Sequence, residues 1–220
     1  MYIVATPIGN LQDVTLRALE VLKSVDVIAC EDTRHSAKFL TSHGIQKRLI
    51  SCRSHNEEDS AKGIIQLLEQ GQDVAYVSDA GTPGVSDPGT VLVKSVRDAG
   101  IAVVPIPGVS ALTALASVAG AQGRTLVFDG FLSTKPGKRR KRLKELLDRN
   151  ENTVVYESPH RIVKLLEDIA EIDPERPVCI GRELTKLHEE FSRGPVSEVL
   201  EDYQARKAVK GELAVFIYSV

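Results

Sequence analysis

A long loop rich in glycine, proline and aspartate is the segment of this sequence best suited to bind a ligand. It runs from residue 77 to residue 89 as VSDAGTPGVSDPG and directly follows an apolar run with the pattern of a buried strand. Gly81 and Gly84 release backbone amides to a close neighbour, and Asp79 adds a carboxylate. A turn that only joins two elements rarely needs so many special residues. The pattern predicts a site for a polar ligand that carries an amino acid and a ribose.

Three other segments place residues that could bind or react with a ligand at the ends of predicted strands, where open α/β sheets bind their ligands. They are TPIGNL at 6–11, IPGVSAL at 106–112 and VYESPHR at 155–161. The first puts proline and glycine in a turn, the second offers Ser110 and free amides at a helix start, and the third gathers an acid, an imidazole and a guanidinium. Taken alone, each also fits a structural role, as a simple turn, an N-cap or a salt-bridged helix start.

The elements that must position these loops alternate between strands and helices. Buried strands of a mainly parallel sheet are predicted at 2–6, 25–30, 74–78 and 102–106, with amphipathic helices at 15–24 and 61–69. After the small, flexible stretch 119–123, further strands are predicted at 126–129, 153–157, 178–181 and 213–218. This alternation predicts an α/β fold. The length suits two units of roughly 100 residues each, which we expect at 1–118 and 119–220.

Positive charge is concentrated in one segment, although the formal net charge is only −2. A predicted loop and helix at 135–149 contain two acids, Glu145 and Asp148, among the cations Lys135, Lys138, Arg139, Arg140, Lys141, Arg142, Lys144 and Arg149. Such a segment can contact several phosphates of a nucleic acid, and it can also be a solvated helix face. Consecutive cations cannot all face a small concave pocket, so we expect RNA phosphate contacts from Lys138, Arg139, Arg140, Lys141 and Arg142.

Several other classes of protein do not fit the sequence. No apolar run approaches the roughly 20 residues of a membrane span, and the start has no signal-peptide pattern, so we expect a cytoplasmic protein without a membrane partner. TPIGNL has one glycine where a dinucleotide fingerprint needs three, and the segment around Lys138 lacks the glycine and hydroxyl residues of a P-loop. The cysteines and histidines show no paired metal-ligand spacing, so we expect no metal.

The motifs also form a recognisable series. TPIGNL, ACEDTRHS, SHNE, SDAGTPGVSDPG, PIPGVSAL, GFLSTKPGKRRKRL, YESPHR, GRELTKLHEEFSRG and KGELAV follow one another along nearly the whole chain. In this order they resemble the rRNA small subunit methyltransferase I family of the tetrapyrrole methylase-like superfamily. The resemblance implies two α/β domains of the tetrapyrrole methylase type, with S-adenosylmethionine (S-adenosyl-L-methionine) in the cleft between them and usually a homodimer. The implied activity is 2′-O-methylation of a cytidine ribose in the decoding region of small-subunit (16S) rRNA.

Matched motif by motif, the resemblance places a set of residues beside the methyl donor. In the first domain these are Pro7, Ile8, Gly9, Asp79, Ala80, Gly81, Thr82, Ser110 and Ala111. In the second domain, Tyr156, Gly211 and Glu212 match places where related methylases touch the cofactor. The expected partner is the small ribosomal subunit or its rRNA.

The expected reaction is an in-line displacement, helped by positioning and by removal of the hydroxyl proton. Candidate bases are Glu31, Asp32, Glu157 and Lys186, of which we prefer Glu157 and Lys186 because each lies next to a predicted strand end of the second domain. Each also fits a structural ion pair. Two other functions stay open on this scaffold: a methylase of tetrapyrroles or other small molecules, against which the basic segment argues, and a non-enzymatic RNA-binding or assembly factor that retains a cofactor pocket.

Overall fold

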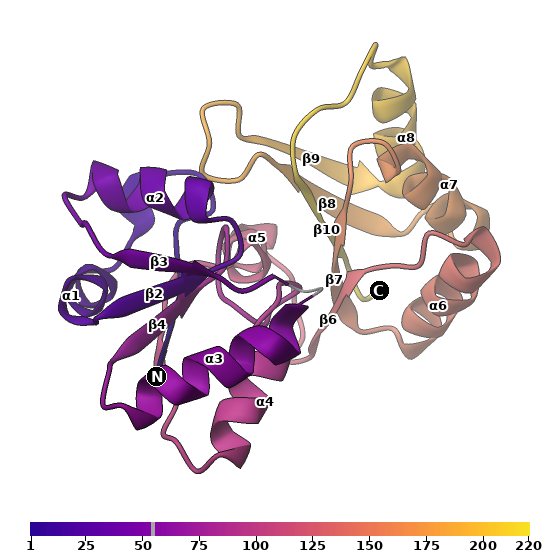
Figure 1. Ribbon diagram of the computed structural model, residues 1–220. Helices are drawn as coiled ribbons and strands as arrows, with labels where there is room; N and C mark the ends of the chain where they lie inside the picture. Colours follow the sequence, from indigo (N-terminus) through magenta and orange to yellow (C-terminus); the bar gives the residue numbers. More distant parts are fainter. Residues whose placement is uncertain (54–55) are drawn as a thin grey trace. The chain divides into compact units, whose positions relative to one another are not determined.

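Over the residues that the structure describes, the chain divides into two units, Met1–Ser110 and Ala111–Val220, each with one five-stranded sheet (Figure 1). The structure is a computed structural model, and it describes residues 1–53 and 56–220. Ser54 and His55 of the motif SHNE therefore lie outside the described residues. Within the described ranges, the helices are too short or too polar to cross a membrane.

The sheet of the first unit is entirely parallel, with strand order β3-β2-β4-β1-β5. Its strands are β1 (Tyr2–Val4), β2 (Val27–Cys30), β3 (Arg48–Ser51), β4 (Val74–Val77) and β5 (Val104–Ile106). β2 and β4 are buried over their whole length, as the β-branched runs predict for strands covered on both faces. Because all five strands point the same way, the loops that follow them meet at one edge of the sheet.

Helices cover both faces of this sheet (Figure 1). On one face lie α1 (Leu16–Ser24) and α2 (Thr33–Ser42), whose Leu22 and Phe39 belong to one apolar cluster with strand residues. On the other face lie α3 (Glu57–Glu69) and α4 (Thr90–Asp98), whose Ile64 and Leu92 pack in a second cluster. A short 3₁₀ turn, η1 (Leu11–Asp13), precedes α1, and Thr15 caps α1 by accepting a hydrogen bond from the Ala18 amide at 3.1 Å.

The sheet of the second unit is mixed, with strand order β6-β7-β10-β8-β9. Its strands are β6 (Leu126–Phe131), β7 (Asn152–Glu157), β8 (Pro177–Arg182), β9 (Glu190–Pro195) and β10 (Leu213–Ile217). β6 and β7 run parallel, whereas β10 is antiparallel to both of its neighbours and β8 and β9 form a hairpin. The register of β6 against β7 shifts between Phe128 and Gly130.

One apolar cluster joins this sheet to α6 (Pro136–Arg149), α7 (Ile162–Ile172) and α8 (Val196–Ala205). Val155 and Val215 point to this cluster, as strand alternation requires. The opposite face is packed by α5 (Ala111–Ala119), which contacts β10, and its Leu115 is fully buried. The chain divides before α5 because this helix packs on the second sheet, whereas the domains predicted from the sequence, 1–118 and 119–220, put the same helix at the end of the first.

Candidate functional site

The loops after β1, β4 and β5 are hydrogen-bonded to one another at the carboxyl edge of the first sheet. Thr6 N donates to Gly81 O at 2.9 Å, and Gly81 N donates to Thr6 O at 3.0 Å. Thr82 Oγ1 donates to the Val109 carbonyl at 3.0 Å and so links the glycine-rich loop to the loop after β5. Three of the segments singled out in the sequence therefore form one connected group of loops.

Two glycines allow these loops to approach so closely. Gly81 has φ +77°, and a Cβ at this position would lie 3.3 Å from Ile8 Cγ2. A Cβ on Gly108 would lie only 2.9 Å from the Cβ of Ala5, a separation that real Cβ atoms do not show. A side chain at Gly108 would therefore force Ala5 to shift, whereas at Gly81 the left-handed backbone strains any other residue and Ile8 must give slightly, so both positions favour glycine.

A buried glutamate fixes the far end of the glycine-rich loop. Glu57 of α3 is 7% exposed, and its Oε1 accepts hydrogen bonds from Gly89 N and Leu92 N, both at 2.9 Å. These amides begin α4, where a carboxylate satisfies unpaired donors and meets the positive end of the helix dipole. This role of Glu57 could not be predicted from the sequence, because no local spacing shows that a residue of one helix caps another.

Acidic residues from the loop after β2 lie next to Asp79. The Asp32 amide donates to Asp79 Oδ1 at 3.0 Å and thereby orients that carboxylate. Burial raises the pKa of Glu31, and the negative charge of Asp79 raises it further. The pKa of Asp32 is instead lowered to about 2, because its carboxylate accepts hydrogen bonds from Arg34. The structure thus brings two of the four candidate bases beside the predicted ligand loop.

In the second unit, Tyr156 orients the start of α5. Its hydroxyl accepts a hydrogen bond from the Leu112 amide at 2.9 Å, one residue after Ala111. Its ring lies edge-on to Phe128 and Phe131, with centroids 4.9 and 5.8 Å away. Tyr156 therefore links the end of β7 to the amides at the beginning of a helix, a place that favours negatively charged groups.

Lys186, Gly211 and Glu212 meet around a residue that the sequence analysis did not identify, Glu183. Lys186 Nζ donates to Glu183 Oε1 and to Glu212 Oε2, both at 2.9 Å. Glu183 Oε1 also accepts from the Glu212 amide at 2.9 Å. Gly211 has φ +91°, and a Cβ there would lie 2.5 Å from Glu183 Cδ. The charged motif after β8 and the turn before β10 are thus held together by these hydrogen bonds and by the close packing at Gly211.

The charges of this cluster are set by its hydrogen bonds. Burial lowers the pKa of Lys186, but the hydrogen bonds to Glu212 and Glu183 outweigh burial and the pKa is raised. Lys186 is therefore held as an ammonium, which donates hydrogen bonds and attracts phosphate. Glu183 and Thr185 have φ of +53° and +64°, values that residues other than glycine rarely adopt. Such backbone outliers concentrate at functional sites.

Glu157, the other preferred base, is buried at the end of β7. It is 2% exposed, its Oε2 lies 3.0 Å from Arg161 Nη2, and its Oε1 accepts from the Ser158 amide at 2.7 Å. Burial raises the pKa of Glu157, while the Ser158 hydrogen bond and the Arg161 charge oppose this rise. Arg161 also donates to the Leu132 carbonyl at 2.8 Å. This is the salt-bridged helix start left open above, and it ties β7 to the loop before α6.

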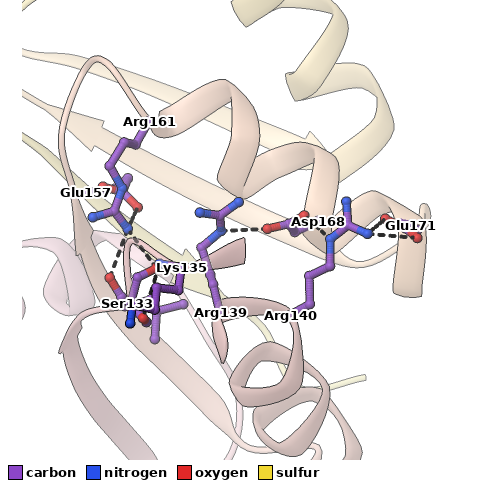
Figure 2. A network of polar contacts seen from close by, with 9 residues as sticks. Ser133, Lys135, Arg139, Arg140, Glu157, Arg161, Asp168 and Glu171 are labelled. Atoms are coloured by element: carbon purple, nitrogen blue, oxygen red, sulfur yellow. Dashed lines mark hydrogen bonds and ion pairs between the residues drawn. The ribbon is translucent and has the colours of Figure 1, made fainter. Parts of the chain in front are cut away.

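The predicted RNA-binding cations fall into two groups, and the first is bonded inside the unit. Arg139 is 4% exposed, and its Nε lies 2.5 Å from Asp168 Oδ2. Arg140 Nε lies 2.7 Å from the other oxygen of Asp168, and its Nη1 lies 3.2 Å from Glu171 (Figure 2). Arg139 cannot contact RNA from this position, contrary to the expectation that all five cations project from the helix. It is buried because it shares a face of α6 with Leu143, one turn later.

Arg142 is bonded in the same way, whereas the lysines are not. Its Nη2 and Nε donate to the two oxygens of Asp129 at 2.6 and 2.9 Å, in the fork geometry typical of arginine and carboxylate. These hydrogen bonds raise the pKa of Arg142. Lys135, Lys138 and Lys141 are exposed, and within the described ranges no ion pair involves any of them.

The predicted cofactor residues thus lie in two groups of loops. Pro7 to Gly9 and Asp79 to Thr82 belong to the bridged loops of the first unit, and buried Ser110 is the last residue of that unit. The second unit holds the remaining predicted residues, Ala111, Tyr156, Gly211 and Glu212. Within the part of the chain that the structure describes, no group of His, Cys, Asp and Glu is arranged to hold a metal ion.

Known methyltransferases share the fold of this chain. The family model of the Tetrapyrrole (Corrin/Porphyrin) Methylases matches residues 1–200. The solved structure of the methyltransferase CobJ is 21% identical and superposes with a TM-score of 0.75, covering 100% of this chain and 93% of that chain. Cobalt precorrin-4 methyltransferase CbiF, a cobalamin biosynthetic enzyme, is 16% identical with a TM-score of 0.73 and covers 99% and 93%. At these identities the likeness shows the fold, which confirms the predicted pair of α/β units.

Relatives named Ribosomal RNA small subunit methyltransferase I are much more similar in sequence. The protein of Neisseria meningitidis serogroup B is 47% identical over 99% of this chain and 75% of its own length. The Thermotoga maritima protein is 46% identical over 99% of this chain and 97% of its own length. The Escherichia coli O157:H7 protein is 45% identical, covering 99% and 77%. The chain therefore belongs to the rRNA small subunit methyltransferase I family, within the tetrapyrrole (corrin/porphyrin) methylases.

Proposed function

We propose that this protein transfers a methyl group from S-adenosylmethionine to the 2′-hydroxyl of a cytidine ribose in the decoding region of small-subunit (16S) rRNA. Membership of a methylase family supports methyl transfer, and the name shared by the relatives supports small-subunit rRNA as the substrate. The cytidine and its hydroxyl follow from the resemblance of the motifs. The observation that carries the proposal is the bridge between Thr6 and Gly81, which joins two of those motifs at the carboxyl edge of a parallel sheet.

The residues of the bridged loops fit the methyl donor. A ligand with an amino acid, a ribose and a base needs carboxylate acceptors and close approach to backbone amides. Asp79 supplies a carboxylate oriented by the Asp32 amide. Gly81 is itself bonded to Thr6 through its amide and its carbonyl, and it contributes by letting the two loops lie close together. S-adenosylmethionine, when bound, supplies a methyl group on a positively charged sulfur. We assign its binding to Pro7, Ile8, Gly9, Asp79, Ala80, Gly81, Thr82, Ser110, Ala111, Tyr156, Gly211 and Glu212.

The two preferred catalytic residues receive different roles from their surroundings. Glu157 is buried and paired with Arg161, so it positions the loop that leads into α6. The side chain of Lys186 is 29% exposed and is fixed between Glu183 and Glu212. It is the residue of this pair that can reach a substrate, and as an ammonium it orients the ribose hydroxyl or an adjacent phosphate. Lys186→Ala should therefore slow single-turnover methylation, while Lys186→Arg, which keeps the charge, should retain part of the rate.

The rRNA contacts are best assigned to the exposed cations of α6. Lys138 and Lys141 remain from the five predicted residues, because Arg139, Arg140 and Arg142 are bonded to acids of their own unit. A cation that touches a phosphate releases counterions from the RNA, whereas a cation paired within the protein releases few. The arginines thus support the helix that presents the lysines.

The decisive experiment is methyl incorporation into small ribosomal subunits that lack the modification. Mass-spectrometric mapping of methylated riboses should find one 2′-O-methylcytidine in the decoding region. A methyl group elsewhere in the rRNA would refute the assigned nucleotide. Normal cofactor binding without incorporation would point to a non-enzymatic assembly factor, and methylation of a tetrapyrrole instead of rRNA would point to a small-molecule methylase.

The resemblance also leads us to propose a homodimer that works in the cytoplasm. One chain has a mass of 24.0 kDa. Sedimentation equilibrium should therefore report twice this mass at micromolar concentration, and a concentration-independent monomer would contradict the dimer.

A further inference from the structure

An irregularity in β6 turns an exposed aromatic ring toward the face of the sheet that holds Tyr156. In the register with β7, Phe128 pairs with Val154 and Phe131 pairs with Tyr156. Asp129 is the extra residue of this β-bulge. Residues three apart in a regular strand point to opposite faces. The extra residue places Phe128 and Phe131 on the same face, where both rings contact Tyr156.

The bulge is held in place from α6. Asp129 receives two hydrogen bonds from Arg142, at 2.6 and 2.9 Å, and the next residue, Gly130, has φ +61°. Bulges of this kind re-aim side chains and are common next to active sites. Arg142 therefore fixes the direction of Phe131 although it does not touch that ring.

The surroundings of Phe131 combine exposed apolar surface with positive charge. Phe131 is 57% exposed, and its strand leads through a short loop into α6. Lys135, Lys138 and Lys141 follow at intervals of three residues, which makes them neighbours on one side of the helix start. The neighbouring arginines, Arg139, Arg140 and Arg142, are paired with acids, so the unpaired positive charge here belongs to the lysines.

We infer that Phe131 stacks on an unpaired base of the substrate RNA and that Lys135, Lys138 and Lys141 hold the phosphates of the same strand. Proteins that bind single-stranded RNA combine an aromatic platform for bases with a row of cations along the backbone. The edge contact with Tyr156 places the platform next to a residue assigned to the methyl donor. The inference rests on the proposed function, because it describes how the rRNA is held at that site.

Fluorescence tests the stacking directly, because the sequence contains no tryptophan. Phe131→Trp introduces a single indole at the platform. Leu126→Trp introduces one at the other end of β6, at a position that is 43% exposed, and serves as the matched control. Titration with a short single-stranded oligocytidine RNA should quench the emission of Phe131→Trp with saturation and leave Leu126→Trp nearly unchanged. An equal response of the two variants would overturn the inference, whether or not the protein methylates rRNA.

Binding to unmethylated small subunits provides the second measurement. Phe131→Ala should weaken binding roughly tenfold without altering its salt dependence, because a stacked ring touches no phosphate. Lys138→Ala combined with Lys141→Ala should instead reduce the steepness of the salt dependence by about one unit per lost contact. If the wild type methylates subunits and Phe131→Ala binds them equally well, the stacking is refuted while the proposed function stands. If the wild type methylates no RNA, the proposed function fails, and the quenching experiment still decides whether the platform binds RNA.

Discussion

Replacing Asp168 by asparagine should destabilise the second unit by about 3–5 kcal/mol, the usual cost of breaking a buried ion pair from one side. Asp168 is 2% exposed and lies 2.5 Å from Arg139 Nε and 2.7 Å from Arg140 Nε. Asparagine keeps the size of the side chain and one oxygen acceptor, so the loss reports the missing charge. The buried guanidinium of Arg139 is left without a counter-charge, whereas Arg140 is 54% exposed in its side chain and can turn to water.

Urea denaturation followed by circular dichroism, fitted with separate transitions for the two units, measures this loss. Glu171→Ala is the matched control, because Glu171 also pairs with Arg140 but its side chain is 62% exposed, and its removal should cost less than about 1 kcal/mol. Replacing both members of the buried pair, with Arg139→Met and Asp168→Leu together, should recover most of the stability. If the free energy of unfolding of Asp168→Asn were within about 1 kcal/mol of the wild-type value, the stability of the second unit would not depend on this ion pair.

Three further outcomes are expected. Asp79→Ala should weaken S-adenosylmethionine binding by about one to two powers of ten in calorimetry, the loss of a charge-assisted hydrogen bond, with RNA binding unchanged. Gly211→Ala should lower stability and cofactor affinity together, since its Cβ would lie 2.5 Å from Glu183 Cδ and its φ is +91°, and unchanged melting would contradict this geometry. The pKa of Glu183 is lowered by the Glu212 amide and by Lys186. The Glu183 carboxylate therefore contributes stability at pH values above its pKa in the unfolded chain. This contribution is lost as the pH falls through its lower pKa in the folded protein. In melting experiments between pH 7 and pH 3, the melting temperature of Glu183→Gln should therefore fall less steeply with decreasing pH than that of the wild type.

The parts of the fold that local pattern determines were predictable from sequence. β4 could be predicted as a buried strand because its apolar run ends at the glycine-rich loop. A strand that is covered on both faces is a continuous apolar run, and this run can be recognised without knowing which strands pair with it. The connected loops followed from a general rule, because parallel strands deliver their loops to one edge. The cofactor itself came only from the combination of motifs, since glycine-rich loops suit several ligands.

Residues whose roles depend on distant partners were not predictable in the same way. Glu57 caps a helix that begins at Thr90, and Glu183 binds the turn before β10, so neither role leaves a local signal. Arg139 is different, because its spacing from Leu143 already puts it on the apolar side of α6. Its charge suggested an exposed contact, but Asp168 on α7 compensates that charge, and only the tertiary structure shows it.

The position of β1 has a consequence for the time at which the first unit can fold during synthesis. Tyr2 pairs with Ala75 on one side and with Val104 on the other. At a translation rate of about 5–20 residues per second, β1 waits about 5–20 s before both neighbours exist. β2 and β3 are close in sequence and can pair earlier, but the bridge between Thr6 and Gly81 cannot form until the loop after β4 has been synthesised. A nascent chain that stalls before residue 104 therefore carries an open strand edge, and such chains should depend most on chaperones.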